Sequence, residues 1–207
     1  MYFFTPPTPA CGDRWAGRTV GLLGGSFNPA HDGHRHISLM ALKQLQLDAV
    51  WWMVSPQNPL KSTHDMAPLR DRLQSARDAS RHPQIVPTDI EQYLNTRYTA
   101  DTLAKLQRHF PKTRFIWLMG TDNLLQVHKW QDWESIFYSV PVCVLDRPPR
   151  GNSLKACPAA TRFRDRMIPE SAAKTLKNRP LPAWTILHIP LNHLSATAIR
   201  AARKGKK

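Results

Sequence analysis

The apolar positions of the chain alternate between short continuous runs and longer stretches with helical spacing. Short runs that are rich in β-branched and aromatic residues and end at glycine or proline predict buried strands. Six such runs occupy residues 18–25, 48–56, 83–89, 114–122, 140–148 and 182–191. Amphipathic patterns predict helices at residues 33–47, 69–80, 98–110 and 195–204. This alternation predicts a single-domain α/β fold that is Rossmann-like and doubly wound, with a mostly parallel sheet and helices on both faces.

Two segments break the alternation. Residues 1–17 show no clear periodicity and predict an irregular leader before one folded domain at residues 18–207. Residues 148–183 are basic and contain several prolines, which predicts a surface insertion with one short helix.

Polar segments follow three of the predicted strands, at residues 24–34, 120–123 and 192–200. In open α/β sheets, ligands bind beyond the carboxyl ends of the strands. We therefore expect the three segments to converge on one ligand site.

The first of these segments, GGSFNPAHDGH, combines a tight turn with the start of a helix. Gly24 and Gly25 allow the backbone to turn sharply and to approach a ligand closely. A helix N-terminus favours an anion, and His31 and His34, three residues apart, lie on one face of its first turn. The segment matches neither GxxxxGK[ST] nor GxGxxG. It therefore predicts a phosphate-binding turn outside those two motifs.

The histidines have two other interpretations. Zinc could bind through His31, His34 and His36, but the last two would diverge on a helix, and no Cys or Glu is placed as a further ligand. We therefore predict no protein-held metal site. Histidines that only cap the loop remain the second alternative.

The chain has 29 Lys and Arg against 15 Asp and Glu, a net charge of +14. This excess predicts a phosphate-bearing partner, either nucleic acid or a nucleotide, and a basic surface without a specific role is an equal alternative. Three widely spaced cysteines favour a reducing compartment. Neither a signal peptide nor an apolar span of about 18 residues is present, so we expect a cytoplasmic protein with no membrane partner.

Two segments near the ends of the chain resemble known signatures. GGSFNPAHDGH resembles the GGxFDPxHxGH signature of the HxGH nucleotidyltransferase superfamily, and LSATAIR resembles its ISSTxIR signature. Between them, RYTADTL, LMGTDNLLQVHKW and VLDRP resemble landmarks of the bacterial nicotinate mononucleotide adenylyltransferase family. The chain departs from the signatures at Asn28, where the family has Asp, and at Ala196, where it has Ser. Asn and Asp behave alike in a turn, whereas Ala196 removes a hydroxyl that could contact phosphate.

This resemblance implies that residues 18–207 form a nucleotidyltransferase domain acting in NAD biosynthesis. The implied reaction transfers the adenylyl group of ATP to nicotinate mononucleotide, giving deamido-NAD and pyrophosphate. Mg²⁺ would accompany ATP, held mostly by phosphate oxygens and water. The implied catalytic residues are His31, His34 and Arg200. The implied ATP-binding residues are Gly24, Gly25, Ser26, Phe27, His31, His34, Gly120, Asp122, Ser195, Thr197 and Arg200. The implied residues for nicotinate mononucleotide are Ser26, Tyr98, Thr99 and Trp130.

One alternative is another enzyme of the same superfamily, acting on nicotinamide mononucleotide or on a phosphopantetheine substrate. The phosphopantetheine type predicts no stacking tryptophan after the GxD motif, whereas Trp130 follows Asp122 here. Trp133 is an equal claimant to that stacking role by composition.

A second alternative is a basic nucleic-acid-binding domain. Such a domain would interleave aromatic with basic residues, but the basic segment 148–183 offers chiefly Phe163. We therefore do not expect nucleic acid as a partner. The sequence does not decide between a monomer and a homo-oligomer, or whether Lys61 and Arg147 contact a ligand.

Overall fold

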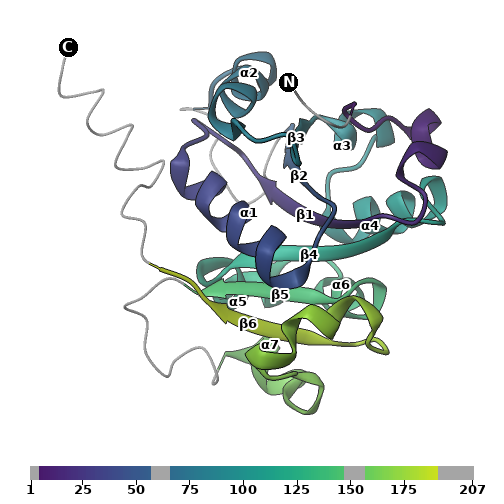
Figure 1. Ribbon diagram of the computed structural model, residues 1–207, viewed down its shortest axis with the longest axis vertical. Helices are drawn as coiled ribbons and strands as arrows, with labels where there is room; N and C mark the ends of the chain where they lie inside the picture. Colours follow the sequence, from purple (N-terminus) through teal and green to yellow (C-terminus); the bar gives the residue numbers. More distant parts are fainter. Residues whose placement is uncertain (1–4, 57–65, 147–156, 191–207) are drawn as a thin grey trace.

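The computed structural model describes residues 5–56, 66–146 and 157–190. Among these residues, six strands form one parallel sheet in the order β3-β2-β1-β4-β5-β6 (Figure 1). The strands are β1 (Thr19–Gly25), β2 (Ala49–Val54), β3 (Ile85–Thr88), β4 (Arg114–Gly120), β5 (Val142–Asp146) and β6 (Trp184–His188). The chain runs outward from β1 to β3 and then returns to place β4 on the other side of β1. This reversal is the switch point of a doubly wound sheet, so the predicted Rossmann-like fold is confirmed.

Helices connect the strands. The α-helices are α1 (Asp32–Leu45), α2 (Leu69–Ser80), α3 (Ile90–Leu94), α4 (Thr99–His109), α5 (Thr121–Gln126), α6 (Trp133–Ser139) and α7 (Pro158–Arg162). The 3₁₀ helices are η1 (Pro9–Trp15), η2 (Val127–Lys129), η4 (Arg164–Arg166) and η5 (Glu170–Asn178). Within the described ranges, no helix is long and apolar enough to span a bilayer.

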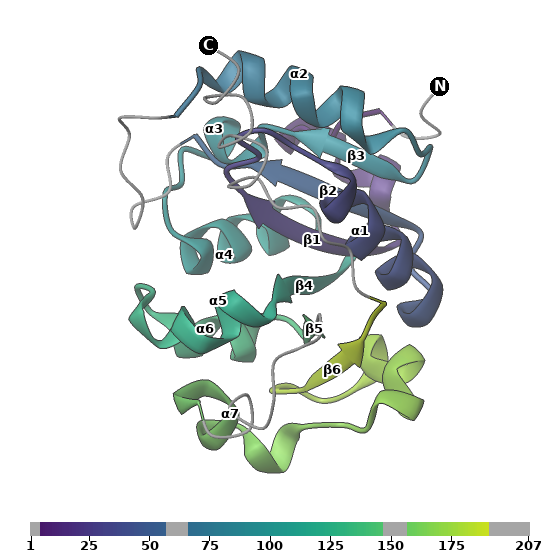
Figure 2. The same cartoon turned by 90° about the vertical axis from the view of Figure 1, so that its left-hand side faces the viewer.

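The helices cover both faces of the sheet (Figure 2). Trp51 and Trp52 are fully buried neighbours on β2 that belong to different core clusters, because successive side chains of a strand point to opposite faces. The Trp51 cluster includes residues of η1, α4 and α6, and the Trp52 cluster includes residues of α1, α2 and η5. Each face of the sheet therefore has its own apolar core.

The N-terminal segment is not wholly irregular, so this part of the prediction for residues 1–17 is wrong. Residues 9–15 form η1, and the Trp15 ring is 1% exposed. That ring packs edge-on against Trp51 at 4.8 Å between centroids. The Thr113 hydroxyl donates to the Trp15 carbonyl at 2.9 Å. The large aromatic area of Trp15 belongs to the core and holds the segment on the sheet.

The predicted surface insertion also needs correction, because its described part, residues 157–183, helps to build the core. Phe163 stacks on Phe137 with ring centroids 4.4 Å apart. The Trp184 indole donates to the Phe163 carbonyl at 2.8 Å, and Leu176 is fully buried. Apolar residues interspersed among the basic ones pack against the β5–β6 side of the sheet, and the charges made this pattern hard to recognise in the sequence.

The predicted C-terminal helix at residues 195–204 lies outside the described residues. The same holds for the predicted site residues Ser195, Thr197 and Arg200, and for Lys61 and Arg147.

Candidate active site

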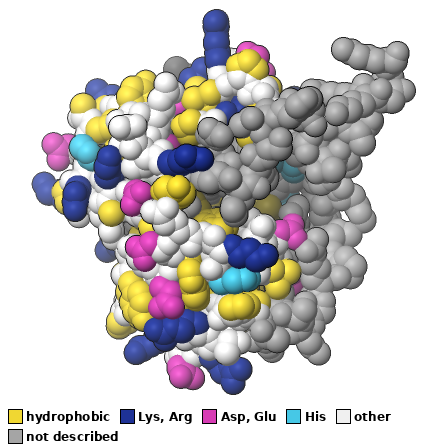
Figure 3. All heavy atoms as spheres, turned by 180° about the vertical axis from the view of Figure 1, so that it is seen from behind, with side chains coloured by type: hydrophobic (Ala, Val, Ile, Leu, Met, Phe, Trp, Pro, Cys, Tyr) yellow, Lys and Arg dark blue, Asp and Glu magenta, His cyan; other side chains and the backbone are white. Residues whose placement is uncertain are grey.

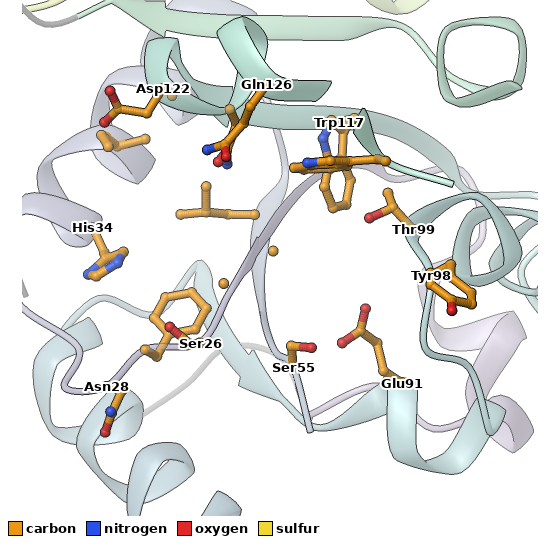
Figure 4. Close-up of a pocket in the computed structure, with 18 of the residues that line it drawn as sticks. Ser26, Asn28, His34, Ser55, Glu91, Tyr98, Thr99, Trp117, Asp122 and Gln126 are labelled. Atoms are coloured by element: carbon orange, nitrogen blue, oxygen red, sulfur yellow. The ribbon is translucent and has the colours of Figure 1, made fainter. Parts of the chain in front are cut away.

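A cavity of about 640 Å³ lies at the carboxyl ends of β1, β2 and β4 (Figure 4). The predicted polar segments 24–34 and 120–123 both contribute to its wall. All the predicted site residues that the structure describes line it: Gly24, Gly25, Ser26, Phe27, His31, His34, Tyr98, Thr99, Gly120, Asp122 and Trp130. The fold thus brings together residues that lie 106 positions apart in the sequence, from Gly24 to Trp130.

His31 and His34 open helix α1 and cap it reciprocally. The Gly33 N–H donates to His31 Nδ1 at 3.1 Å, and the His31 N–H donates to His34 Nδ1 at 3.3 Å. Because each Nδ1 accepts a hydrogen bond, a neutral ring carries its proton on Nε2. The two rings lie 3.9 Å apart between centroids. The capping alternative is therefore present in the structure, and a neutral ring in this arrangement has its N–H group at Nε2, beside the helix N-terminus.

His36 does not share this arrangement. Its Nε2 lies 3.0 Å from the carbonyl oxygen of Pro190, just after β6, and the residue does not line the cavity. Among the described residues, no group of three or more His, Cys, Asp or Glu side chains is placed to hold a metal ion.

The turn after β1 depends on close packing at glycine and on a strained phenylalanine. A Cβ added to Gly24 would lie 2.8 Å from Cη2 of Trp117, so a larger side chain does not fit there without movement. Phe27 adopts a left-handed backbone with φ of 46°. Its ring is buried between Trp52 and His34, at 5.2 and 4.8 Å between centroids. Phe27 therefore fixes the turn with its side chain and can bind a nucleotide only through its backbone.

Asn28, the first departure from the signature, has a clear role in this turn. Its Oδ1 accepts a hydrogen bond from the Ala67 N–H at 3.3 Å. An aspartate oxygen could accept the same bond, so the substitution preserves the contact.

The side chain of Arg72 binds the backbone of the turn after β1, and the sequence interpretation missed this residue. Its guanidinium donates to four backbone carbonyl oxygens: those of Ser26 at 2.8 Å, Ser55 at 2.7 Å, Pro56 at 2.9 Å and Ala67 at 2.9 Å. Desolvation by burial lowers the pKa of Arg72 from its ordinary value. The buried cation ties the end of β1 to the end of β2.

Helix α4 begins at the other side of the cavity. Tyr98 is its N-cap residue and Thr99 its first residue, so the free N–H groups of an 11-residue helix lie at the cavity wall. This placement supplies a second positively polarised helix end.

The structure separates the two candidate stacking tryptophans. Trp130 lines the cavity and contacts the Trp117 ring edge-on, with centroids 6.5 Å apart. Trp133 instead packs against Phe137 and Phe163, at 6.1 and 5.8 Å, and does not line the cavity. Of the two candidates, Trp130 is therefore the one that lines the cavity, and its stacking role stays a prediction.

Asp122 lies in the first turn of α5, while Gly120 is the N-cap residue of that helix. The adjacent Thr121 hydroxyl donates to Oδ1 of buried Asp146 at 2.8 Å, which joins the start of α5 to the end of β5. Asp122 is exposed and lines the cavity. It is thus placed at the ligand side and not at the capping position.

Glu91 is a second residue that the sequence interpretation missed. Its side chain lines the cavity although the residue is only 8% exposed. Burial raises the pKa of this carboxyl to about 7, and the nearby hydroxyls of Ser55 and Thr102 oppose that rise. No local pattern marks Glu91 or Arg72 in the sequence, because both acquire their surroundings from distant segments.

Comparisons with known proteins agree with this geometry. Residues 22–202 match the family model described as cytidylyltransferase-like. The chain is 51% identical over 182 residues to a probable nicotinate-nucleotide adenylyltransferase of Cereibacter sphaeroides, covering 88% of this chain and 96% of the relative. The chain belongs to the nicotinate-nucleotide adenylyltransferase family. A second family member, from Parvibaculum lavamentivorans and also named as probable, is 52% identical, covering 89% of this chain and 92% of that one.

A solved structure shows the same fold at much lower sequence identity. The Plasmodium falciparum nicotinic acid mononucleotide adenylyltransferase, complexed with NaAD, is 16% identical and has a TM-score of 0.65. The match covers 89% of this chain and 83% of that protein. At this identity the likeness supports the family's fold and carries no residue roles.

Proposed function

We propose that this protein transfers the adenylyl group of ATP to nicotinate mononucleotide, giving deamido-NAD and pyrophosphate. One observation carries the proposal: a single cavity joins the histidine-capped start of α1 to the start of α4 and to Trp130. The first feature suits a triphosphate, and the other two suit a pyridine ring that bears a carboxylate. The names of the relatives point to the same reaction.

At the α1 end, the histidines act on developing charge. The attacking 5′-phosphate is already anionic, so the reaction needs no strong general base and depends on positioning and charge stabilisation. The Nε2–H groups of His31 and His34 donate to oxygens of the ATP α-phosphate as the new P–O bond forms. The first N–H groups of α1 and the backbone of the glycine turn provide further positive polarity.

At the α4 end, the pyridine nucleotide is held by its ring and its carboxylate. Trp130 stacks on the ring, and the N–H and hydroxyl of Thr99 donate to the carboxylate beside Tyr98. Asp122 and Gly120 lie between the two ends of the cavity, where the ATP nucleoside fits.

The remaining contacts fall on residues that lie outside the described ranges. By resemblance, Ser195, Thr197 and Arg200 hold the β- and γ-phosphates. By resemblance, Mg²⁺ would accompany ATP and be held mostly by phosphate oxygens and water. Bound there, it would neutralise phosphate charge.

Steady-state turnover tests the proposal. The purified protein is incubated with ATP, Mg²⁺ and either nicotinate or nicotinamide mononucleotide, and the dinucleotide and pyrophosphate are quantified by chromatography and a coupled assay. We expect equal amounts of both products and a preference for the acid substrate. Absence of dinucleotide with either mononucleotide would contradict the proposal.

The alternatives receive less support from the structure. A cavity wall that includes Trp130 favours a pyridine ring over a pantetheine chain. Among the described residues visible in Figure 3, Lys and Arg side chains are scattered among acidic and apolar ones and form no continuous stripe for nucleic acid.

A further inference from the structure

Glu91 combines burial with access to the cavity. It lies on α3, whose neighbouring side chains Ile90 and Leu94 are part of the core. In Figure 4 its carboxylate points into the cavity near Ser55, and Thr99 and Tyr98 stand on the adjacent wall. A carboxyl in this position faces the same part of the cavity as the start of α4.

The hydrogen bonds of Glu91 are incomplete. Its Oε1 accepts from the Thr102 hydroxyl at 3.4 Å, but the same hydroxyl lies closer to Thr96 Oγ1, at 2.9 Å, and to the Tyr98 carbonyl, at 3.0 Å. The Thr102 hydroxyl has a single proton, so it can donate to only one of these three acceptors at a time. Oε2 is buried and has no hydrogen-bond partner among the described residues. A buried polar atom of this kind is costly unless a ligand completes it.

We propose that Glu91 contacts the pyridine substituent of the mononucleotide and selects the acid over the amide by donating its carboxyl proton to the substrate carboxylate. This inference rests on the proposed function and assigns a further specificity residue to it. Two adjacent carboxylates cannot both stay ionised at low cost, so the acid substrate requires a neutral Glu91. An ionised Glu91 would instead accept an N–H from a carboxamide.

Burial favours the neutral form of Glu91, since it raises the pKa of the carboxyl to about 7. Helices α4 and η1 pack against α3 and carry ionisable residues, among them Lys105 on α4 and Asp13 and Arg14 on η1. Four ionisable side chains are described by their contacts: Arg72, Lys105, Arg97 and Tyr98. Arg72 and Lys105 donate to backbone carbonyls, while Arg97 and Tyr98 line the cavity. None of the four is among the causes of the Glu91 shift, which are burial and the hydroxyls of Ser55 and Thr102.

The preference for the acid substrate should decrease as the pH rises. Glu91 is protonated below about pH 7 and ionised above it, and kcat/KM reports the state of the free enzyme. Above that pH, kcat/KM for nicotinate mononucleotide falls by about tenfold per pH unit relative to kcat/KM for nicotinamide mononucleotide. The histidines and the substrate 5′-phosphate are common to both reactions, so their titrations cancel in the acid-to-amide ratio.

The test compares this ratio in the wild type, Glu91→Gln and the control Glu134→Gln from about pH 6 to about pH 9. Glu134 is a surface carboxyl on α6 that pairs with Arg162 at 3.3 Å. We expect the ratio to fall with pH in the wild type and in the control. In Glu91→Gln it stays flat, because glutamine is neutral throughout and still has an N–H to donate. The variant should therefore exceed the wild type in acid turnover at the highest pH, which a merely structural role would not produce.

Several results would overturn this proposal. A wild-type ratio that does not change with pH overturns it without any variant, as does an equal slope in Glu91→Gln. Calorimetry in buffers of different ionisation enthalpy gives a readout independent of turnover. At about pH 8.5, we expect the wild type to take up about one more proton from the buffer than Glu91→Gln does when each binds nicotinate mononucleotide. If the wild type turns over neither mononucleotide, it is the proposed function that fails.

Discussion

Arg72 provides the sharpest test of how the glycine turn is held in place. The substitution Arg72→Lys keeps the charge but replaces a planar fork of donors with one ammonium group. Arg72 is 2% exposed and makes four hydrogen bonds to backbone carbonyls of three chain segments. A single ammonium cannot reach all four oxygens from the position of the guanidinium.

The magnitude follows from these contacts. If lysine keeps two of the four bonds, the loss at about 1.5 kcal/mol for each charged hydrogen bond is about 3 kcal/mol in the free energy of unfolding. For a protein of this size, that loss lowers the Tm by about 6–12 °C. A displacement of the turn by about 1 Å also lowers kcat, by about 100-fold. The free energy is measured by urea unfolding followed by circular dichroism, and kcat at a temperature where the variant is folded.

Arg70→Lys is the matched control, because Arg70 lies two residues earlier on the same helix and is exposed. We expect it to change the free energy of unfolding by less than about 0.5 kcal/mol. If Arg72→Lys is no more destabilising than Arg70→Lys and leaves kcat unchanged, Arg72 does not hold the turn as described.

Three further predictions concern the cavity itself. His34→Ala should lower kcat by about 10²–10³-fold with little change in KM for the mononucleotide, because it removes a donor to the transition state; unchanged kcat in steady-state assays would refute that role. Trp130→Ala should raise KM for the mononucleotide by about 30-fold, because about 2 kcal/mol of stacking is lost. Trp133→Ala should chiefly lower the Tm, because it removes a packed aromatic ring. The opposite pattern of KM and Tm changes would reverse the two assignments. The raised pKa of Glu91 means that ionisation costs stability as pH rises from about 4.5 to about 7. Glu91→Gln should therefore gain about 3 kcal/mol relative to the wild type between about pH 4.5 and about pH 8 in urea unfolding, and a constant difference would contradict this.

Much of the fold could be predicted because its signals are local. The run around Trp51 and Trp52 is apolar on both sides, as a central parallel strand with helices on both faces requires. The spacing of His31 and His34 and the distance from Asp122 to Trp130 likewise lie within single segments. The structure brings these segments into one cavity.

The features that were missed depend on packing between distant segments. Trp15 and Phe163 lie in stretches whose prolines and charges hide their contacts, yet both rings are buried against aromatic partners from elsewhere in the chain. Arg72 looks like any polar residue of an amphipathic helix until the ends of β1 and β2 come within its reach. Glu91 becomes unusual only when α3 packs below the cavity. Such environments form only in the folded chain, and the spacing of residues in the sequence does not indicate them.

Adenylyl transfer breaks the bond between the α- and β-phosphates of ATP, and isotope tracing shows which bond is broken. The wild type is given ATP labelled at the α-phosphorus or at the γ-phosphorus, together with nicotinate mononucleotide, and the products are separated by chromatography. We predict that the α label appears in the dinucleotide and the γ label in pyrophosphate. Release of the γ label as inorganic phosphate, or recovery of the α label in ADP or free AMP, would contradict adenylyl transfer.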